Sequence, residues 1–418
     1  SLVNVANTSD ITMGGKESFG MKWSSRVSNA STMDNTGTIT VSGDAGTDNS
    51  LSSGIAVVEN FDYSGADAIR AYTGKVTNNG TIAVSGGKAN TGMVLIVDAA
   101  DDITNTSTGK ITVNSTAGKQ NMGMRVDKGA VSTDSAGTPV AINEGKIHLS
   151  GDSSIGMASN KQSKIKNTAT TSEITSAGAI VQNAIGMVTD GGTVENDSKI
   201  ELLGSGASTN TGVLLVNQNS GSTPSGTFGT NSNIKVTGDN SIGALVRDGS
   251  LAYAGTTLVQ GNGVAGIVVG DDNTHTATVN GTNSGTITVN GGAATTPAGI
   301  YSYTSPSGAT VRKGSYGLLV GKNSTFNNSN VGVDVNVKEK ESIGIYAGDG
   351  AHITIGNHTV KASDGAVNYV ASDGSTITLQ GTGTNVETGN KSLLFYLGNS
   401  GTGVININGA MNANILGG

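Results

Sequence analysis

The sequence predicts an all-β fold, a right-handed parallel β-helix built as a three-faced solenoid of roughly fourteen rungs with loop insertions. Three observations predict it: a composition rich in glycine and poor in aromatic residues, a recurring glycine–apolar step, and a second repeated unit of alternating apolar and polar residues. Glycine supplies 64 of the 418 residues and aromatic residues only 4%. A chain so poor in large side chains has to spread its burial over many small contacts, as stacked repeats do.

The first repeated unit is a glycine followed by an apolar run. The residue after the glycine is apolar in every copy, and the residue two positions beyond it often is as well, as in Val57 and Leu95. This is the period of a half-buried strand, so we expect one face of it to be core, with the methionines after glycines pointing inward. The copies are Gly20-Met21, Gly54-Ile55, Gly92-Met93, Gly123-Met124, Gly156-Met157, Gly186-Met187, Gly212-Val213, Gly243-Ala244, Gly266-Ile267, Gly299-Ile300, Gly317-Leu318, Gly344-Ile345 and Gly365-Ala366.

Two further units complete the predicted rung. The second has an Asn/Gly turn before alternating residues, and it predicts strands ending at Val41, Val84, Val113, Leu149, Leu202, Val236 and Val289. The third follows Asp-Gly turns and predicts short strands over 251–254, 351–355 and 375–379. Turn and strand three times per circuit describe a three-faced coil. We expect one solenoid domain over 1–418, with insertions near 58–78, 127–142, 217–230 and 301–316.

Composition and charge exclude several classes of function. The formal net charge of −7 is spread over 13% charged residues, so there is no basic stripe and nucleic acid is excluded as a partner. The absence of cysteine removes disulfides, thiolate catalysis and zinc-thiolate sites. No stretch reaches the roughly 20 apolar residues of a membrane helix. The chain opens at Ser1 without a signal peptide, which favours a fragment or a processed product.

The repeats resemble a known family. The alternation of N-x-G-x-I-x-V with S-I-G, as at Ser154 to Met157, Ser241 to Ala244 and Ser342 to Ala347, is similar to the passengers of type V autotransporters. It most resembles the large fusobacterial autotransporter adhesins of the RadD-like class. The resemblance implies a surface-exposed passenger that adheres to host receptors, glycans or other bacteria. It also implies anchoring through an outer-membrane barrel. We expect that barrel to be absent from this chain, and we expect a monomer without cofactor.

Aromatic residues in the insertions are the candidate partner-binding residues. In a chain so poor in aromatics, three tyrosines beside two cations between the glycines at 299 and 317 could stack on a sugar or fill a partner's pocket. A similar cluster occupies an earlier long interval. The alternative is that some tyrosines cover the neighbouring rung. The candidates are Tyr301, Tyr303, Arg312, Lys313, Tyr316, Phe61, Tyr63 and Tyr72.

No catalytic or metal-binding residue is predicted. Gly151-Asp152-Ser153-Ser154 resembles the nucleophile motif of serine hydrolases, but it recurs in register at Gly238 to Ser241, which indicates a turn. The four histidines form no i, i+4 pair, and alternation predicts that His352 faces solvent. The aspartate pairs at 101–102 and 271–272 could bind calcium, but they lack the nonapeptide spacing of calcium repeats.

Three hypotheses of function remain open. The chain is expected to be a non-catalytic adhesin segment on the bacterial surface, binding a host receptor, a glycan or another bacterium through loops on a rigid β-helical rod. The alternatives are a passive spacer within a larger adhesin and, less favoured, a β-helical polysaccharide lyase or hydrolase. The fold cannot choose among them, because function is determined by the sites placed on it.

Overall fold

The protein is a parallel β-helix, as the repeats predict. In the computed structural model, long sheets are built only from parallel strand pairs, and the described residues contain no helix, so none that could cross a membrane. The structure describes residues 4–23, 31–43, 52–58, 74–97, 101–128, 138–218, 222–270, 276–280, 283–292, 303–304, 311–312, 314–398 and 402–416. Most residues of the predicted insertions near 58–78, 127–142 and 301–316 lie outside these ranges, whereas most residues of 217–230 are described.

The chain divides into two compact units, and each is described by itself. Unit 1 comprises Ser1–Glu201 with Asn217–Pro224, and unit 2 comprises Leu202–Val216 with Ser225–Gly418. We name the rows of strands sheet A, sheet B and sheet C in the order in which a rung passes through them. In each sheet a strand pairs with its equivalent one rung away, so that the backbone groups of a strand are satisfied by its neighbours.

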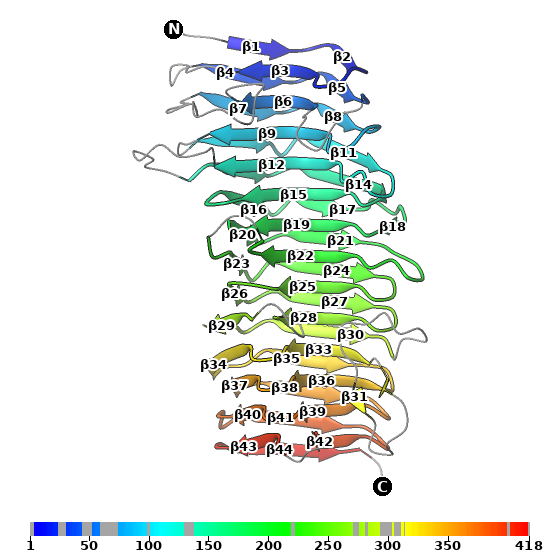
Figure 1. Cartoon of the computed structure of the whole chain (residues 1–418), viewed down its shortest axis with the longest axis vertical. Helices are drawn as coiled ribbons and strands as arrows, with labels where there is room; N and C mark the ends of the chain where they lie inside the picture. The colour runs from blue at the N-terminus through cyan, green and yellow to red at the C-terminus, as the bar shows by residue number, and fades with distance from the viewer. Residues whose placement is uncertain are drawn as a thin grey trace. The chain divides into compact units, whose positions relative to one another are not determined.

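Unit 1 has three such sheets (Figure 1). Sheet A contains β1 (Asn4–Asn7), β4 (Thr32–Asn35), β7 (Lys75–Asn78), β10 (Asp102–Asn105), β13 (Val140–Asn143), β16 (Lys164–Asn167) and β20 (Thr193–Asn196). Sheet B contains β2 (Asp10–Met13), β5 (Thr38–Val41), β8 (Thr81–Val84), β11 (Lys110–Ser115), β14 (Lys146–Asp152), β17 (Glu173–Thr175) and β21 (Lys199–Leu202), with β18 (Val181–Gln182) beside β14. Sheet C contains β3 (Phe19–Trp23), β6 (Ser53–Val58), β9 (Thr91–Val97), β12 (Met122–Lys128), β15 (Ile155–Asn160) and β19 (Ile185–Asp190).

Unit 2 begins with the same three rows and then replaces sheet A by a sheet D. Sheet A contains β23 (Ser225–Phe228) and β26 (Ser250–Tyr253), and sheet D contains β29 (Thr278–Asn280), β34 (Thr325–Val331), β37 (His352–Asn357), β40 (Thr376–Leu379) and β43 (Val404–Ile407). Sheet B contains β24 (Asn233–Thr237), β27 (Thr256–Gln260), β30 (Thr286–Asn290), β35 (Asp334–Val337), β38 (Thr359–Ala362), β41 (Thr384–Thr388) and β44 (Met411–Ile415). Sheet C contains β22 (Thr211–Val216), β25 (Ile242–Val246), β28 (Ala265–Val269), β33 (Ser315–Val320), β36 (Ser342–Ala347), β39 (Val367–Ala371) and β42 (Leu393–Leu397). A short antiparallel pair, β31 (Tyr303–Thr304) with β32 (Val311–Arg312), forms a separate two-stranded sheet.

The glycines of sheet C stack because their backbones pack against each other from rung to rung. A Cβ added to Gly123 would lie 2.6 Å from the carbonyl oxygen of Gly156 and 2.8 Å from Cγ2 of Ile147. Only glycine fits such a position. The residue after each glycine points into the core, and Met93, which follows Gly92, is 0% exposed, as predicted.

One predicted copy of the step is wrong. Gly365 lies in a left-handed turn, with φ of 73°, before β39. In register, Ile345 pairs with Tyr369, so Asn368 stands where a glycine is expected. The copy at Gly299 lies outside the described residues.

A ladder of buried asparagines closes the turn after sheet A in unit 1. The Nδ2 of each side chain donates to Oδ1 of the next over 2.7–2.9 Å. Within the described residues of unit 1 the ladder consists of Asn7, Asn35, Asn78, Asn105, Asn143, Asn167 and Asn196. In unit 2, Phe228 and Tyr253 occupy the matching strand ends, and their rings pack edge to face, 6.1 Å apart.

Sheet C departs from prediction because it is buried on both faces over several rungs. Every residue of β6, β25, β28, β33 and β36 is buried, so the strand is not half-buried there. The outward side chains form two apolar clusters, one around Ala56 and Val94 and one around Val268 and Leu319. Parallel strands covered on both faces are near-continuous apolar runs, which is the pattern of Gly317 to Val320.

Candidate functional site

The predicted binding residues are mostly outside the described residues. Tyr301, Lys313, Phe61, Tyr63 and Tyr72 fall in ranges that are not described. Of Tyr303 and Arg312 only the backbone is described, and the two residues pair across β31 and β32. The prediction that these seven residues bind a partner therefore stays a prediction.

Tyr316 is described, and it lies in an apolar cluster on the outward side of sheet C. Its ring packs edge to face on Tyr346 with centroids 5.5 Å apart, and the residue is only 3% exposed. A ring so buried has little surface to offer a partner. The alternative for this tyrosine, that it covers the neighbouring rung, agrees with its position beside Ile343, its register partner in β36.

The serine of the S-I-G motif has a structural role. Ser154, Ser241 and Ser342 are fully buried. Ser241 Oγ accepts a hydrogen bond from the backbone N–H of Asn210 over 3.1 Å and donates to the carbonyl of Thr237 over 3.3 Å. The serine thus satisfies backbone groups where the chain turns from sheet B into sheet C. Because serine, glycine and the following apolar residue are all needed by the fold, the motif carries no information about a ligand.

The hydrolase-like motif is a turn. Ser153 has φ of 61°, and its counterpart Asn240 has φ of 60°. The Ser153 hydroxyl donates to Oδ1 of Asp152 over 2.9 Å, and Asn183 Nδ2 donates to the same atom over 2.9 Å. A left-handed residue occurs two positions before the first paired residue of sheet C in many rungs: Glu17, Ala89, Gln120, Ser153, Asn183, Thr209, Asn240, Gly263, Gly365 and Lys391. In β36 the left-handed Glu341 lies one position before the first paired residue, Ser342.

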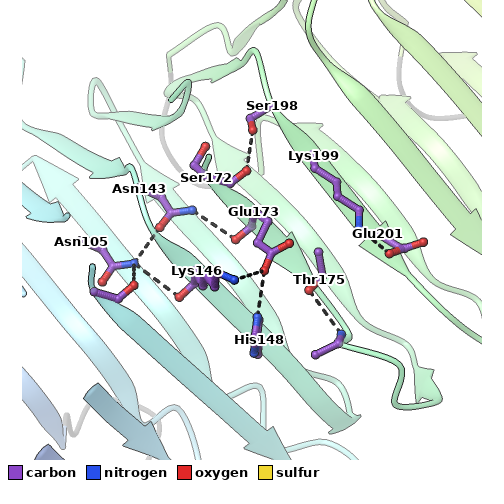
Figure 2. A network of polar contacts seen from close by, with 12 residues as sticks. Asn105, Asn143, Lys146, His148, Ser172, Glu173, Thr175, Ser198, Lys199 and Glu201 are labelled. Atoms are coloured by element: carbon purple, nitrogen blue, oxygen red, sulfur yellow. Dashed lines mark hydrogen bonds and ion pairs between the residues drawn. The ribbon is translucent and has the colours of Figure 1, made fainter. Parts of the chain in front are cut away.

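A network of charged and polar side chains covers the outward face of sheet B in unit 1 (Figure 2). Glu173 Oε1 lies 3.1 Å from His148 Nε2 and 3.5 Å from Lys146 Nζ, while Lys199 Nζ lies 2.8 Å from Glu201. Partial burial by itself would raise the pKa of Glu173, but the hydrogen bond from His148 and the nearby lysines outweigh it and hold the pKa below its ordinary value. The charges compensate one another, so this network stabilises the face rather than presenting a net charge.

Sheet A of unit 1 carries a similar arrangement. Glu195 lies 2.7 Å from Lys164 Nζ and 3.2 Å from Lys166 Nζ. Its partial burial opposes ionisation, but the two ammonium groups lower its pKa overall. As ion pairs that solvent still reaches, such contacts contribute little to stability, on the order of 1 kcal/mol or less each.

The histidines and aspartates form no metal site among the residues described. No group of three or more His, Asp and Glu side chains in those ranges could hold an ion. His352 is exposed, as predicted, whereas His358 is 4% exposed and hydrogen bonded in the core of unit 2. The aspartate pair at 271–272 and His275 lie outside the described residues, so that part of the calcium alternative stays open.

Three hollows of unit 2 lie on the outward face of sheet B and at the corner where the chain turns into sheet C. A hollow of about 630 Å³ opens over β38, β41 and β44, and one of about 550 Å³ adjoins it toward the corner. Both are bordered by Lys361 and Glu387. A smaller hollow of about 300 Å³ shares Glu339 and Lys340 with the second. Sequence reasoning missed this surface, because it belongs to ordinary strand positions and not to an insertion.

The first of these, which we call the amide hollow, is lined by two parallel rows of polar side chains. Strand register aligns Lys361 with Glu387 and Glu387 with Asn414, and it aligns Asn385 with Asn412. The inward neighbours Val360 and Val386 are buried, so the polar rows face solvent. Its outward lining consists of Thr359, Lys361, Asn385, Glu387, Asn412 and Asn414.

Comparison with known proteins identifies no relative. No protein-family model matches the chain, and no curated protein or solved structure is significantly similar to it.

Proposed function

We propose that the chain is a non-catalytic adhesive segment of a bacterial surface protein, of the passenger type found in the RadD-like autotransporter adhesins. In this proposal it is exposed outside the cell, where it binds a host receptor, a glycan or another bacterium. The parallel β-helix and the S-I-G and N-x-G-x-I-x-V repeats support it. The helix and its repeats are features of the fold and do not by themselves bind a ligand. A role in adhesion therefore depends on the residues that face outward.

The observation that carries the proposal is the division between inward and outward residues. The residues of the repeat motifs have structural roles inside the rungs. Gly123 allows the backbones of adjacent rungs to approach closely, Met157 fills the core, and Ser241 accepts a hydrogen bond from a backbone N–H at the turn. On the outward side, unit 2 has hollows lined by exposed polar residues such as Asn385 and Asn412. Exposed amide groups such as these can bind a ligand by both donating and accepting hydrogen bonds.

A binding screen tests the proposal. The chain is immobilised and exposed to cell-surface receptors, a panel of glycans and whole bacterial cells, and saturable binding to one of them is expected. A passive spacer would give no saturable signal with any of them. Calcium-dependent cleavage of a polysaccharide would contradict the non-catalytic part of the proposal and favour the lyase alternative.

A further inference from the structure

The amide hollow differs from the other hollows in the chemistry of its side chains. Asparagine amides and a threonine hydroxyl provide most of its outward lining, and these groups both donate and accept hydrogen bonds. Asn385, Asn412 and Asn414 are exposed. Carboxylates only accept hydrogen bonds, and ammonium groups only donate them. A lining of amides therefore suits a ligand whose own groups both donate and accept hydrogen bonds.

The charges at this hollow cancel. Lys361 Nζ lies 3.4 Å from a carboxylate oxygen of Glu387, and the two are register partners on adjacent strands. Within the lining of the amide hollow they are the one cation and the one anion. An ionic ligand would have to compete with a pair already formed, whereas a neutral one would meet no net charge.

The register of the strands sets the spacing of the polar side chains in the amide hollow. Asn385 and Asn412 are register partners, and Asn412 Nδ2 lies 3.3 Å from Asn385 Oδ1. Adjacent strands place equivalent side chains roughly 4.8 Å apart. Polar groups therefore repeat along the stacking direction, which fits an extended ligand with hydrogen-bonding groups at regular intervals better than a compact one.

We propose that the amide hollow binds a neutral, hydroxyl-rich oligosaccharide laid along the stacking direction of β38, β41 and β44. This rests on the proposed function, because it names the ligand class of the adhesive surface. The Asn385 and Asn412 amides bridge sugar hydroxyls, each donating to one oxygen and accepting from another. The Lys361–Glu387 pair leaves the face uncharged, so neutral glycans bind in preference to sulfated or carboxylated ones.

The direct test uses the full 418-residue chain and titrates it with neutral hexose and N-acetylhexosamine oligomers and with heparan sulfate and polygalacturonate. Asn385→Ala and Asn412→Ala are each expected to weaken binding of the neutral oligomers at least about fivefold. The matched control is Asn233→Ala, because Asn233 is an exposed residue of the same sheet, in register with Thr256 of β27, and lies outside the hollow. Unchanged affinity in both hollow variants would overturn the proposal.

A second variant tests the role of charge. Glu387→Gln leaves Lys361 without its carboxylate partner, so affinity for heparan sulfate should rise several-fold and fall with added salt, while neutral binding changes less. Selective, salt-dependent binding of acidic glycans by the unaltered chain would contradict the inference. Saturable binding to cells with no response to any glycan would overturn the inference alone. No binding to cells, receptors or glycans would overturn both it and the proposed function.

Discussion

His358 Nε2 lies 2.8 Å from the hydroxyl oxygen of Tyr369, and both side chains are buried in the core of unit 2. The other ring nitrogen, Nδ1, lies 2.6 Å from the carbonyl oxygen of Gly356, which can only accept. Nδ1 therefore carries the proton, and Nε2 accepts from the Tyr369 hydroxyl. Burial lowers the pKa of His358, and the Gly356 carbonyl and the charge of Asp334 offset this only in part.

Unit 2 should lose stability as the pH falls below about 6.5, the pKa of an unperturbed histidine. Below that pH the histidine of the unfolded chain takes up a proton while the folded His358 stays neutral. The contribution of His358 to the stability of unit 2 is therefore complete above about pH 6.5 and declines below it. The slope approaches roughly 1.4 kcal/mol per pH unit until the folded group also titrates. Urea unfolding between pH 7.5 and 5.5 measures this slope.

Two variants assign the pH dependence to this residue. His358→Phe removes the titrating group, so the slope should flatten even though the Tyr369 hydroxyl loses its partner and overall stability drops. His352→Gln, which removes an exposed histidine of the same unit, is the matched control variant. An equally steep slope in His358→Phe would show that another group is responsible.

The asparagine ladder of unit 1 makes Asn105 a sensitive position. It accepts from Asn78 and donates to Asn143 over 2.8 Å each, and it is fully buried. Asn105→Ala leaves a buried donor and a buried acceptor unsatisfied, so we expect a loss of roughly 2–5 kcal/mol in the free energy of unfolding. Chemical denaturation measures it. The control is Asn114→Ala at an exposed position, which should cost less than about 0.5 kcal/mol.

The stacked glycines of sheet C predict that two glycine-to-alanine substitutions differ strongly in their cost to the free energy of unfolding. Gly123→Ala would force its Cβ against the Gly156 carbonyl and Ile147, spreading adjacent rungs and costing about 3 kcal/mol or more. A Cβ at Gly14 would meet nothing within 4 Å, so Gly14→Ala should be nearly neutral. Thermal unfolding of both variants tests this, and equal midpoints would refute the close-approach explanation.

Much of this architecture follows from the sequence, because each rung repeats the same physical requirement. Glycine before an inward residue marks sheet C, and alternation such as Thr38 to Val41 marks sheet B. The asparagine ladder was visible only as a turn signal. Its members are set by three-dimensional register, so Asn78 and not Asn79 belongs to it. A single sequence does not show which of two adjacent asparagines turns inward.

The candidate site was much less predictable than the fold. The prediction concentrated on aromatic residues in insertions, yet Tyr316 is buried in the apolar cluster on the outward side of sheet C. The amide hollow instead combines outward residues of three rungs that are separated by more than twenty positions in sequence, such as Lys361, Glu387 and Asn414. Each is an ordinary polar residue on a strand, and only the stacking of rungs brings them together.

The last rung of unit 2 should be the least stable part of that unit. Leu379 of β40 and Ile407 of β43 are register partners, yet Leu379 is 1% exposed and Ile407 is 44% exposed. Leu379→Ala should therefore cost about 2–5 kcal/mol and Ile407→Ala less than about 1 kcal/mol. Because each rung of a solenoid contacts only its neighbours, β43 amides should also exchange hydrogen faster than β40 amides. Equal costs and equal exchange rates would mean that β43 is covered in solution by a surface that the described residues do not provide.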